Sequence, residues 1–362
     1  MAQYRLIGTE MSYFSGKARS YLRWKGVDFE EVPPTPDVMK DEVIANIGWP
    51  VIPVLRTPEG TYVQDTFEII EHFEEHASTS PVYPASPLQT FASLLIQLYA
   101  DEWLVLPSMH YRWNHNEDWV YGQFGANAAP GGTPEEQYEA GKKAGARFKG
   151  ALPVLGISEA TVPGIEAAYL QTLKDLSAHL DTHPFLFGAR ASFADFCMMG
   201  ALYAHMYRDP ASGALMKREA PQVADYVERT MAGAGREGAL LDGHSIPDTV
   251  LPLLQRQMKE QLPMVLSSAS QLADWAVSAE HGAEVPRGFG PIPFQTGDAA
   301  GTCVGRSFPV YRLQNAIDRL GAALEGAPEE TRAFLDQIGG TKLLDLPEIP
   351  RLARRNYRLC LA

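Results

Sequence analysis

The first 76 residues alternate between apolar runs of strand length and segments with helical spacing. Period-two or continuous apolar patterns predict strands at residues 4–7, 27–32, 52–55 and 61–63. Helical spacing and capping signals predict helices at residues 15–26, 36–45 and 66–75. A Thr-Pro-Glu-Gly turn between the last two strands indicates a β-hairpin. The resulting order, βαβαββα, predicts a compact α/β domain.

After a proline-rich stretch at residues 81–87, the pattern changes to helices alone. Helical spacing is found at residues 88–114, 134–149, 162–180, 192–207, 221–232, 247–280 and 308–324. A Gly/Pro-rich stretch, residues 286–305, lies between the last two. We therefore predict an α/β domain over residues 1–80, an all-helical domain over residues 86–240, and a mainly helical extension. The extension covers residues 241–362 and is expected to pack on the helical domain.

Composition narrows the class of protein. Hydrophobic residues make up 45% and charged residues 21% of the 362 positions, which is typical of soluble globular proteins. The net charge of −13 gives an acidic surface that repels nucleic acid. The most apolar stretch, Phe91 to Leu106, is interrupted by Gln97, Asp101 and Glu102, so we expect no membrane span. Three widely spaced cysteines favour free thiols, and without a signal pattern at the N-terminus we expect a cytoplasmic protein.

Three separated features of the first domain predict one binding site. Ser12 stands at the start of a helix, where backbone N–H groups and the helix dipole favour an anion. Pro53 is expected at the start of a strand, because proline has no N–H to donate to the hydrogen-bond ladder. In that position it leaves the backbone of Ile52 free to pair with an extended ligand. At the last helix, the Thr66 hydroxyl and the first-turn N–H groups suit a carboxylate, and Asp65 suits an ammonium. This combination fits the tripeptide γ-glutamyl-cysteinyl-glycine, which is glutathione.

The same residues resemble the motifs of the glutathione S-transferase family. The segment Ile52 to Leu55 is similar to the family's Val-Pro-Val-Leu segment, and Asp65 to Ile70 is similar to its Glu-Ser-x-x-Ile motif. The segment Ser12 to Arg19 resembles the opening motif Ser/Cys-Pro-Phe-x-x-Arg-x-Arg of the serine- and cysteine-type classes. Farther along, Gly188 to Asp195 resembles the family's capping box, in which a Ser/Thr N-cap is followed by an Asp at N3. The extension resembles nothing in the family.

The resemblance implies a thioredoxin-like N-terminal domain, an all-α domain and a glutathione transferase activity (EC 2.5.1.18-like) on a small apolar electrophile. Ser12 would stabilise the glutathione thiolate, with Tyr13 and Tyr4 as competing hydroxyls. A free thiol has a pKa of about 8.5, and a hydrogen bond to a charged group contributes about 1.5–3 kcal/mol. One hydroxyl therefore lowers the thiol pKa by roughly one to two units. Because Ser12 and Ser15 stand where redox members of the fold carry cysteine, disulfide reduction is disfavoured.

The resemblance also implies how glutathione is held as the co-substrate. The cysteinyl part would pair with the Ile52 backbone beside Pro53, and Asp65 and Thr66 would hold the γ-glutamyl end. Many family members carry a lysine near the glycine carboxylate of glutathione, and a valine stands there in this chain. Either Trp49 or a residue outside the domain would complete that end, or glutathione would bind weakly.

The second substrate is expected between the first domain and the start of the helical domain. Trp103, His110 and Trp113 are the candidates for the wall of an apolar pocket. The competing interpretation is a buried helix face, because aromatic residues at helical spacing are mostly core. His110 and His115 are five residues apart, so one helix would not present both to a metal ion, and we expect no metal.

Several alternatives stay open on the sequence alone. Arg112 and Arg208 would either hold an acidic substrate group or be solvated or ion-paired. The resemblance implies a homodimer, but the extension can block or reshape the usual interface. The alternative function is a non-catalytic binding or interaction protein of the same fold, and a third is an enzyme whose extension supplies a new active site.

Overall fold

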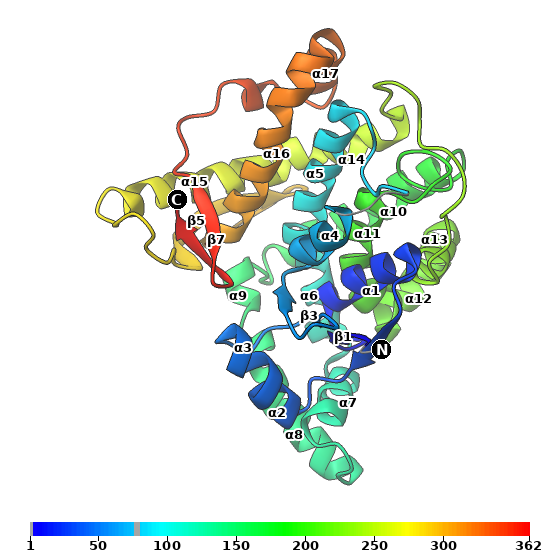
Figure 1. Cartoon of the computed structure of the whole chain (residues 1–362), viewed down its shortest axis with the longest axis vertical. Helices are drawn as coiled ribbons and strands as arrows, with labels where there is room; N and C mark the ends of the chain where they lie inside the picture. Colours follow the sequence, from blue (N-terminus) through cyan, green and yellow to red (C-terminus); the bar gives the residue numbers. More distant parts are fainter. Residues whose placement is uncertain (1–2, 76–79) are drawn as a thin grey trace. The chain divides into compact units, whose positions relative to one another are not determined.

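The computed structural model describes residues 3–75 and 80–362 (Figure 1). The chain divides into two compact units. Unit 1 is formed by residues 1–82, 108–151 and 195–238. Unit 2 is formed by residues 83–107, 152–194 and 239–362. Each unit is therefore assembled from three stretches of chain that are far apart in the sequence.

Unit 1 contains a mixed four-stranded sheet with the order β2-β1-β3-β4. Its strands are β1 (Tyr4–Ile7), β2 (Phe29–Val32), β3 (Val54–Arg56) and β4 (Tyr62–Gln64). Strands β1 and β2 are parallel because a helix crosses between them, whereas β3 is antiparallel to both β1 and β4. This arrangement confirms the predicted thioredoxin-like α/β domain.

The helices of this α/β region are set by their caps. They are α1 (Tyr13–Lys25), α2 (Pro36–Val38), the π-helix η1 (Met39–Ile44), α3 (Ala45–Ile47) and α4 (Thr66–Glu74). Helix α1 begins earlier than predicted because Ser12 is its N-cap. It ends at Gly26, whose φ of 77° is a left-handed conformation that glycine adopts without a steric penalty.

The rest of unit 1 is helical. Its elements are most of α6 (Val105–His115), α7 (Glu117–Ala128), α8 (Pro134–Lys149), most of α11 (Phe193–Ala201), the π-helix η2 (Leu202–Tyr207), α12 (Pro210–Glu219) and α13 (Pro221–Met231). Helices α7 and α8 approach so closely that a Cβ on Gly141 would lie 1.8 Å from the carbonyl oxygen of Tyr121. Glycine is therefore needed at this helix contact.

Unit 2 combines helices with two β-hairpins. Its main helices are α5 (Pro87–Glu102), α9 (Leu152–Leu155), α10 (Val162–Leu180), α14 (Leu251–Arg256), α15 (Leu262–Ala276), α16 (Ser307–Gly326) and α17 (Pro328–Gln337). Shorter elements are the 3₁₀ helices η3 (Asp248–Val250) and η5 (Thr341–Leu344) and the π-helix η4 (Gln257–Gln261). The hairpins are β5 (Gly288–Thr296) with β6 (Ala299–Arg306), and β7 (Leu352–Arg355) with β8 (Arg358–Leu361). The predicted mainly helical extension is confirmed, with hairpins added.

Two local features differ from the sequence-based expectation. The single helix predicted over residues 88–114 is two helices, because α5 ends at Glu102 and the N–H of Leu104 bonds back to the carbonyl of Tyr99. The Gly/Pro-rich stretch at residues 286–305 forms a β-hairpin with a two-residue turn at Gly297 and Asp298. Burial of every second side chain along the end of β5 gives this hairpin its inner face.

The extension completes the core of unit 2 around α5. Helix α16 lies alongside α5 (Figure 1). From η4, the side-chain amides of Gln257 and Gln261 donate to the carbonyls of Leu95 and Leu98, at 2.7 and 2.8 Å. These bonds hold α5 against the extension at main-chain level. None of the helices in the described residues is both long and apolar enough to cross a membrane.

Candidate functional site

The register of the sheet brings the three predicted binding features to one end of it. Ile7, the last residue of β1, pairs with Val54, the first residue of β3. Val54 in turn pairs with Gln64, the last residue of β4. The loop to α1, the segment before β3 and the start of α4 therefore lie at the same end of the sheet, where β1 and β4 finish and β3 begins. We call this end of the strands the edge of the sheet.

Ser12 is half-buried at this edge and caps α1. Its Oγ accepts a hydrogen bond from the N–H of Ser15 at 3.3 Å, and its own N–H donates to the carbonyl of Thr9 at 3.0 Å. A serine hydroxyl has two acceptor lone pairs and one proton to donate. No described residue accepts that proton. The hydroxyl is thus oriented by the helix and still able to donate to an anion.

The neighbouring Ser15 and the two competing hydroxyls, those of Tyr13 and Tyr4, have different surroundings. Ser15 is fully buried, and its Oγ would collide at 2.8 Å with a Cβ on Gly8. The ring of Tyr13 is buried beside Gly200. Tyr4 lies at the far end of β1, with its ring against Phe73 at a centroid distance of 5.2 Å. Of these hydroxyls, Ser12 has the geometry of a donor at the edge of the sheet.

The Ile52–Pro53 segment leads into β3. The peptide bond between the two residues is cis, and Ile52 lies before the first ladder pair, which is that of Val54. Its backbone is therefore outside the ladder and half-buried at the same edge as Ser12. Trp49, the residue considered for the glycine end of glutathione, is half-buried, and so is Val51, the valine that stands where many family members carry a lysine.

Asp65, rather than Thr66, is the N-cap of α4. Its Oδ1 accepts from the N–H of Phe67 at 2.8 Å. Asp65 has φ 88° and ψ 137°, a backbone conformation that side-chain-bearing residues rarely adopt and that is concentrated at functional sites. Thr66 is the first helical residue, and no described group pairs with its hydroxyl. The positive helix end and this hydroxyl are the features that suit a carboxylate.

Arg112 supports the Ser12 turn and was not assigned this role from the sequence. Its guanidinium is buried and donates to the carbonyl of Met11 at 2.7 Å and to that of Ala204 at 2.9 Å. It also forms a bidentate ion pair with Asp209, at 2.7 and 2.8 Å. Burial raises the pKa of the Asp209 carboxyl, and the Arg112 guanidinium opposes this by favouring the charged form. The sequence alternative of an ion-paired arginine is thus realised at this position.

A second charged group lies behind the same loop. Arg19 is fully buried and donates through Nε to Glu31 at 2.6 Å. Glu10 lies 3.5 Å from the Arg19 guanidinium and accepts a hydrogen bond from the Tyr203 hydroxyl. Burial and the Glu10 carboxylate raise the pKa of Tyr203 to about 12, so the phenol stays protonated and donates. The loop before Ser12 is therefore anchored on both sides.

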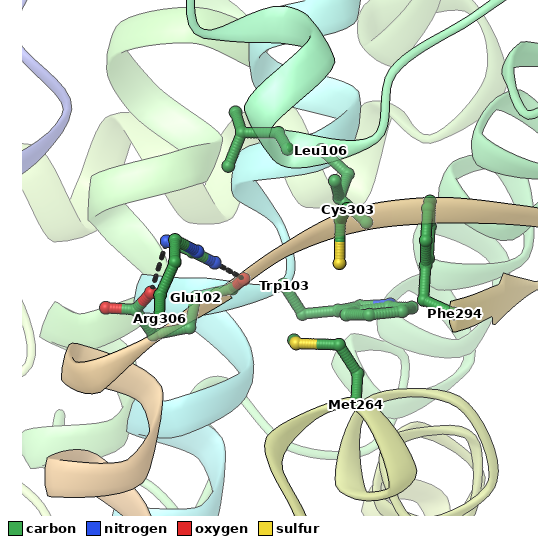
Figure 2. A pocket seen from close by; sticks show the side chains of 8 residues that line it. Glu102, Trp103, Leu106, Met264, Phe294, Cys303 and Arg306 are labelled. Carbon is green, nitrogen blue, oxygen red and sulfur yellow. Dashed lines mark hydrogen bonds and ion pairs between the residues drawn. The ribbon is translucent and has the colours of Figure 1, made fainter. Parts of the chain in front are cut away.

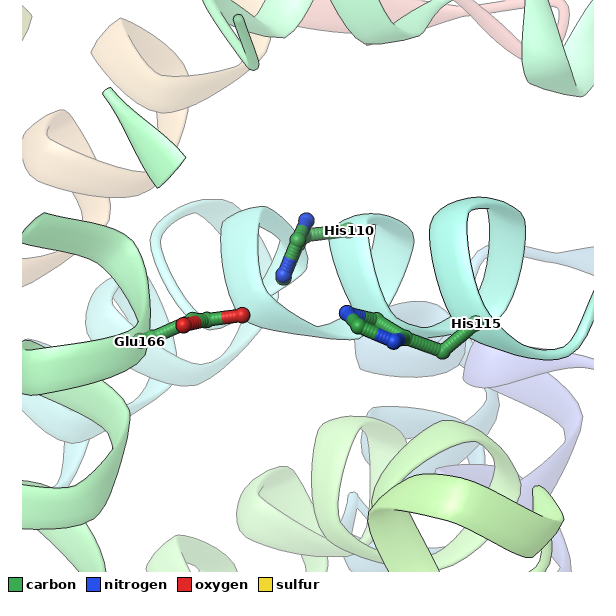
Figure 3. A group of neighbouring side chains, drawn as sticks. All are labelled: His110, His115 and Glu166. Carbon is green, nitrogen blue, oxygen red and sulfur yellow. The ribbon is translucent and has the colours of Figure 1, made fainter. Parts of the chain in front are cut away.

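Trp113 and His110, two of the candidates for the wall of the second substrate's apolar pocket, lie on α6. Trp113 is buried and stacks on Phe124 of α7 at a centroid distance of 5.9 Å. His110 is buried, and its ring meets that of His115 edge-on at 5.1 Å (Figure 3). Figure 3 also draws Glu166, which belongs to unit 2. Within unit 1, then, Trp113 packs in the helical core and His110 forms a pair with His115. The expectation that one helix would not present these two histidines together was wrong, because their rings meet near the C-terminal end of α6.

The third candidate, Trp103, belongs to unit 2. It is buried and lines a cavity of about 10 Å³, with Met264, Phe294 and Cys303 around it (Figure 2). This volume holds about one water molecule. Burial raises the pKa of the Cys303 thiol to about 11, so the thiol is protonated and a poor nucleophile at neutral pH.

Two family models match the chain in order. "Glutathione S-transferase, N-terminal domain" matches residues 6–81, and "Glutathione S-transferase, C-terminal domain" matches residues 158–233. No curated protein sequence matches.

Several solved structures are similar to the chain. A glutathione S-transferase from Rhodospirillum rubrum is 16% identical, with a TM-score of 0.41, over 68% of this chain and 96% of that one. A beta-etherase from a Sphingobium species is 17% identical, with a TM-score of 0.43, over 65% and 97%. A glutathione S-transferase from Methylobacillus flagellatus with GSH bound is 17% identical, with a TM-score of 0.37, over 64% and 96%.

Proposed function

Because the chain belongs to the glutathione S-transferase family, carrying both of its domains in order, we propose that unit 1 binds glutathione and activates its thiol. The observation that carries this proposal is the Ser12 hydroxyl, which caps α1 at the sheet edge and has a proton to donate. The proposed reaction is attack of the glutathione thiolate on a small electrophile with a flat apolar body.

Glutathione would lie along the edge of the sheet from α4 to β3. Its γ-glutamyl carboxylate would meet the Thr66 hydroxyl and the N-terminus of α4, and its ammonium would meet Asp65. Its cysteinyl backbone would pair with Ile52, whose own backbone lies outside the ladder. This placement directs the thiol toward Ser12, because Ile7 at the end of β1 pairs with Val54 at the start of β3.

The chemistry asked of Ser12 is modest and fits one hydroxyl. Donation from Ser12 to the thiolate lowers the thiol pKa by roughly one to two units. The N–H of Ser15 donates to the Ser12 oxygen and polarises the hydroxyl, which favours a negative thiolate beside it. The positive N-terminus of α1 favours the thiolate in the same way. In the reaction, the thiolate sulfur forms a bond to carbon while the leaving group departs with the electron pair of the bond that breaks. In an addition, that pair moves onto the acceptor instead.

Calorimetric titration of the full chain with reduced glutathione tests the binding step. We expect saturable one-site binding that weakens about tenfold or more in Thr66→Ala, because one hydrogen bond to a charged group is lost. The matched control is Thr133→Ala, which removes the exposed hydroxyl cap of α8 in the same unit. Absence of binding at millimolar glutathione contradicts the proposal and favours the alternative, a non-catalytic protein of this fold.

A further inference from the structure

We propose that Arg208, beside the ring of Trp119, binds a carboxylate of the second substrate, so that the electrophile is a flat molecule carrying an acidic group. The catalytic meaning of this inference rests on the proposed function of unit 1. The binding of an aromatic acid at Arg208 does not require it.

Among the described residues, no carboxylate forms an ion pair with Arg208, whereas Arg19 pairs with Glu31 and Arg112 with Asp209. Its guanidinium is half-buried and donates through Nη2 only to the neutral side-chain amide of Gln123, at 3.2 Å. Its Nη1 is shielded from solvent, and no described residue accepts a hydrogen bond from it. A shielded donor without an acceptor costs about 1–3 kcal/mol, and more when it is charged. A carboxylate that replaces the Gln123 amide removes this cost.

Two carboxylates of the same region, those of Asp209 and Glu10, are already committed to other groups. Asp209, the next residue, has one oxygen on Nε and the other on Nη2 of Arg112. Glu10 accepts from the Tyr203 hydroxyl and faces Arg19 at 3.5 Å. Arg208 and Asp209 still attract each other electrostatically, but both carboxylate oxygens of Asp209 accept hydrogen bonds from Arg112. A ligand is therefore the natural source of an acceptor for Arg208.

One face of α7 links Arg208 to the Ser12 turn. Trp119, Gln123 and Asn127 follow one another at intervals of four residues and so share that face. The Arg208 guanidinium lies 5.6 Å from the ring centroid of Trp119, and the Asn127 amide donates to the Thr9 hydroxyl at 3.2 Å. Gln123 and Asn127 are about 6 Å apart along the helix axis. The carboxylate subsite thus lies about one helical turn from Thr9, whose carbonyl accepts from the Ser12 N–H.

The chemistry of these two side chains selects the ligand class. A guanidinium presents parallel N–H donors that match the two oxygens of a carboxylate. The half-buried Trp119 offers an aromatic surface against which a flat ring packs. An aromatic or conjugated carboxylate satisfies both groups together, whereas a neutral aromatic compound satisfies only Trp119.

Calorimetric titration of the full chain with 2-naphthoate and 2-naphthamide tests this proposal. We expect naphthoate to bind more tightly than naphthamide. Arg208→Gln should weaken the binding of naphthoate about ten- to a hundredfold and leave the affinity for naphthamide unchanged. The control Arg218→Gln removes an arginine that is 64% exposed and paired with Glu219, and should bind both as the parent chain does. Naphthamide binding as tightly as naphthoate, or no binding of naphthoate, overturns the proposal without any variant.

Failure of the variant to fold is distinguished by a glutathione titration and by Arg208→Lys. The lysine keeps the charge but loses the fork of donors, so naphthoate should weaken by at least about threefold. Equal naphthoate affinity in the parent chain and a folded Arg208 variant overturns the proposal. If glutathione does not bind but naphthoate still binds through Arg208, the proposed function fails and the acid site stands.

Discussion

Arg112 is the buried residue that most directly holds the Ser12 turn in place. Its guanidinium ties together the carbonyl of Met11, the carbonyl of Ala204 and the carboxylate of Asp209. A buried charge pair contributes little net stability when compared with apolar residues of the same size, but removing one partner leaves the other buried and unpaired. The role of Arg112 is therefore to position the turn.

We expect Arg112→Met to lower the free energy of unfolding by about 3–5 kcal/mol, because Asp209 then keeps a buried charge without a partner. The double variant Arg112→Met with Asp209→Leu should lose less than the sum of the two single variants, with a coupling of at least about 1 kcal/mol. Denaturant titrations of the four proteins measure this. Additive losses would mean that the two side chains do not act as a pair.

At the scale of elements, the hairpin of β5 and β6 is held by a close contact with α10. Gly164 packs on the hairpin so tightly that a Cβ there would lie 2.2 Å from the carbonyl oxygen of Thr296. Glu260 of η4 accepts from the N–H of Gly297 in the turn, at 3.1 Å. The tip of the hairpin is thus fixed from two sides.

Gly164→Ala should destabilise unit 2 by about 1–3 kcal/mol, since the added methyl group must push the hairpin away from α10. The matched control is Gly321→Ala on α16, where a Cβ meets nothing within 4 Å. That change should stabilise the protein by about 0.5–1 kcal/mol, because alanine favours the helix. Thermal unfolding compares the two variants, and equal melting temperatures would contradict the tight contact.

The α/β domain and most helices were predictable because their signals are local. Period-two strands, a hairpin turn and glycine C-caps such as Gly26 act over a few residues. The hairpin at residues 286–305 was missed because prolines and glycines suggested a connection. The signal that marks it is Gly297-Asp298 between alternating buried residues such as Ile292 and Phe294.

The candidate site was predictable only in part. Motifs placed Ser12, Ile52 and Thr66 at one sheet edge, and the register brings them there. The partners of Arg112 and Arg208 lie on elements distant in the sequence, so no spacing rule distinguishes the committed arginine from the one without an acidic partner. That distinction depends on tertiary contacts.

At the scale of the whole molecule, each unit buries a neutral histidine. His179 in unit 2 is 1% exposed and lies 2.8 Å from the Thr249 hydroxyl. Burial lowers its pKa from 6.5 to about 4. Burial, with Arg112 nearby, also lowers the pKa of His205 in unit 1 well below its usual range. Both imidazoles must gain a proton when the chain unfolds in acid.

The sign of the pH dependence follows from these lowered pKa values. Between pH 6.5 and pH 4 the unfolded chain binds a proton at His179 that the folded chain does not. The free energy of unfolding therefore falls as the pH falls through this window, and the contribution of His179 is fully present above pH 6.5. We expect about 2 kcal/mol to be lost between pH 7 and pH 5 at this position. His179→Gln should remove this slope from unit 2, whereas the exposed-residue control His281→Gln should keep it. Equal slopes in both variants would show that His179 does not titrate in this way.

The pKa of the glutathione thiol in the bound state reports whether the Ser12 hydroxyl activates it. The absorbance of the glutathione thiolate is followed against pH in the unmodified chain, in Ser12→Ala and in Thr133→Ala. The last variant loses a hydroxyl cap of the same kind from α8. We predict a thiol pKa roughly one to two units below that of free glutathione in the unmodified chain and in Thr133→Ala. In Ser12→Ala the thiol pKa should return toward that of free glutathione. A lowered thiol pKa that persists in Ser12→Ala would contradict the assignment of Ser12 as the activating hydroxyl.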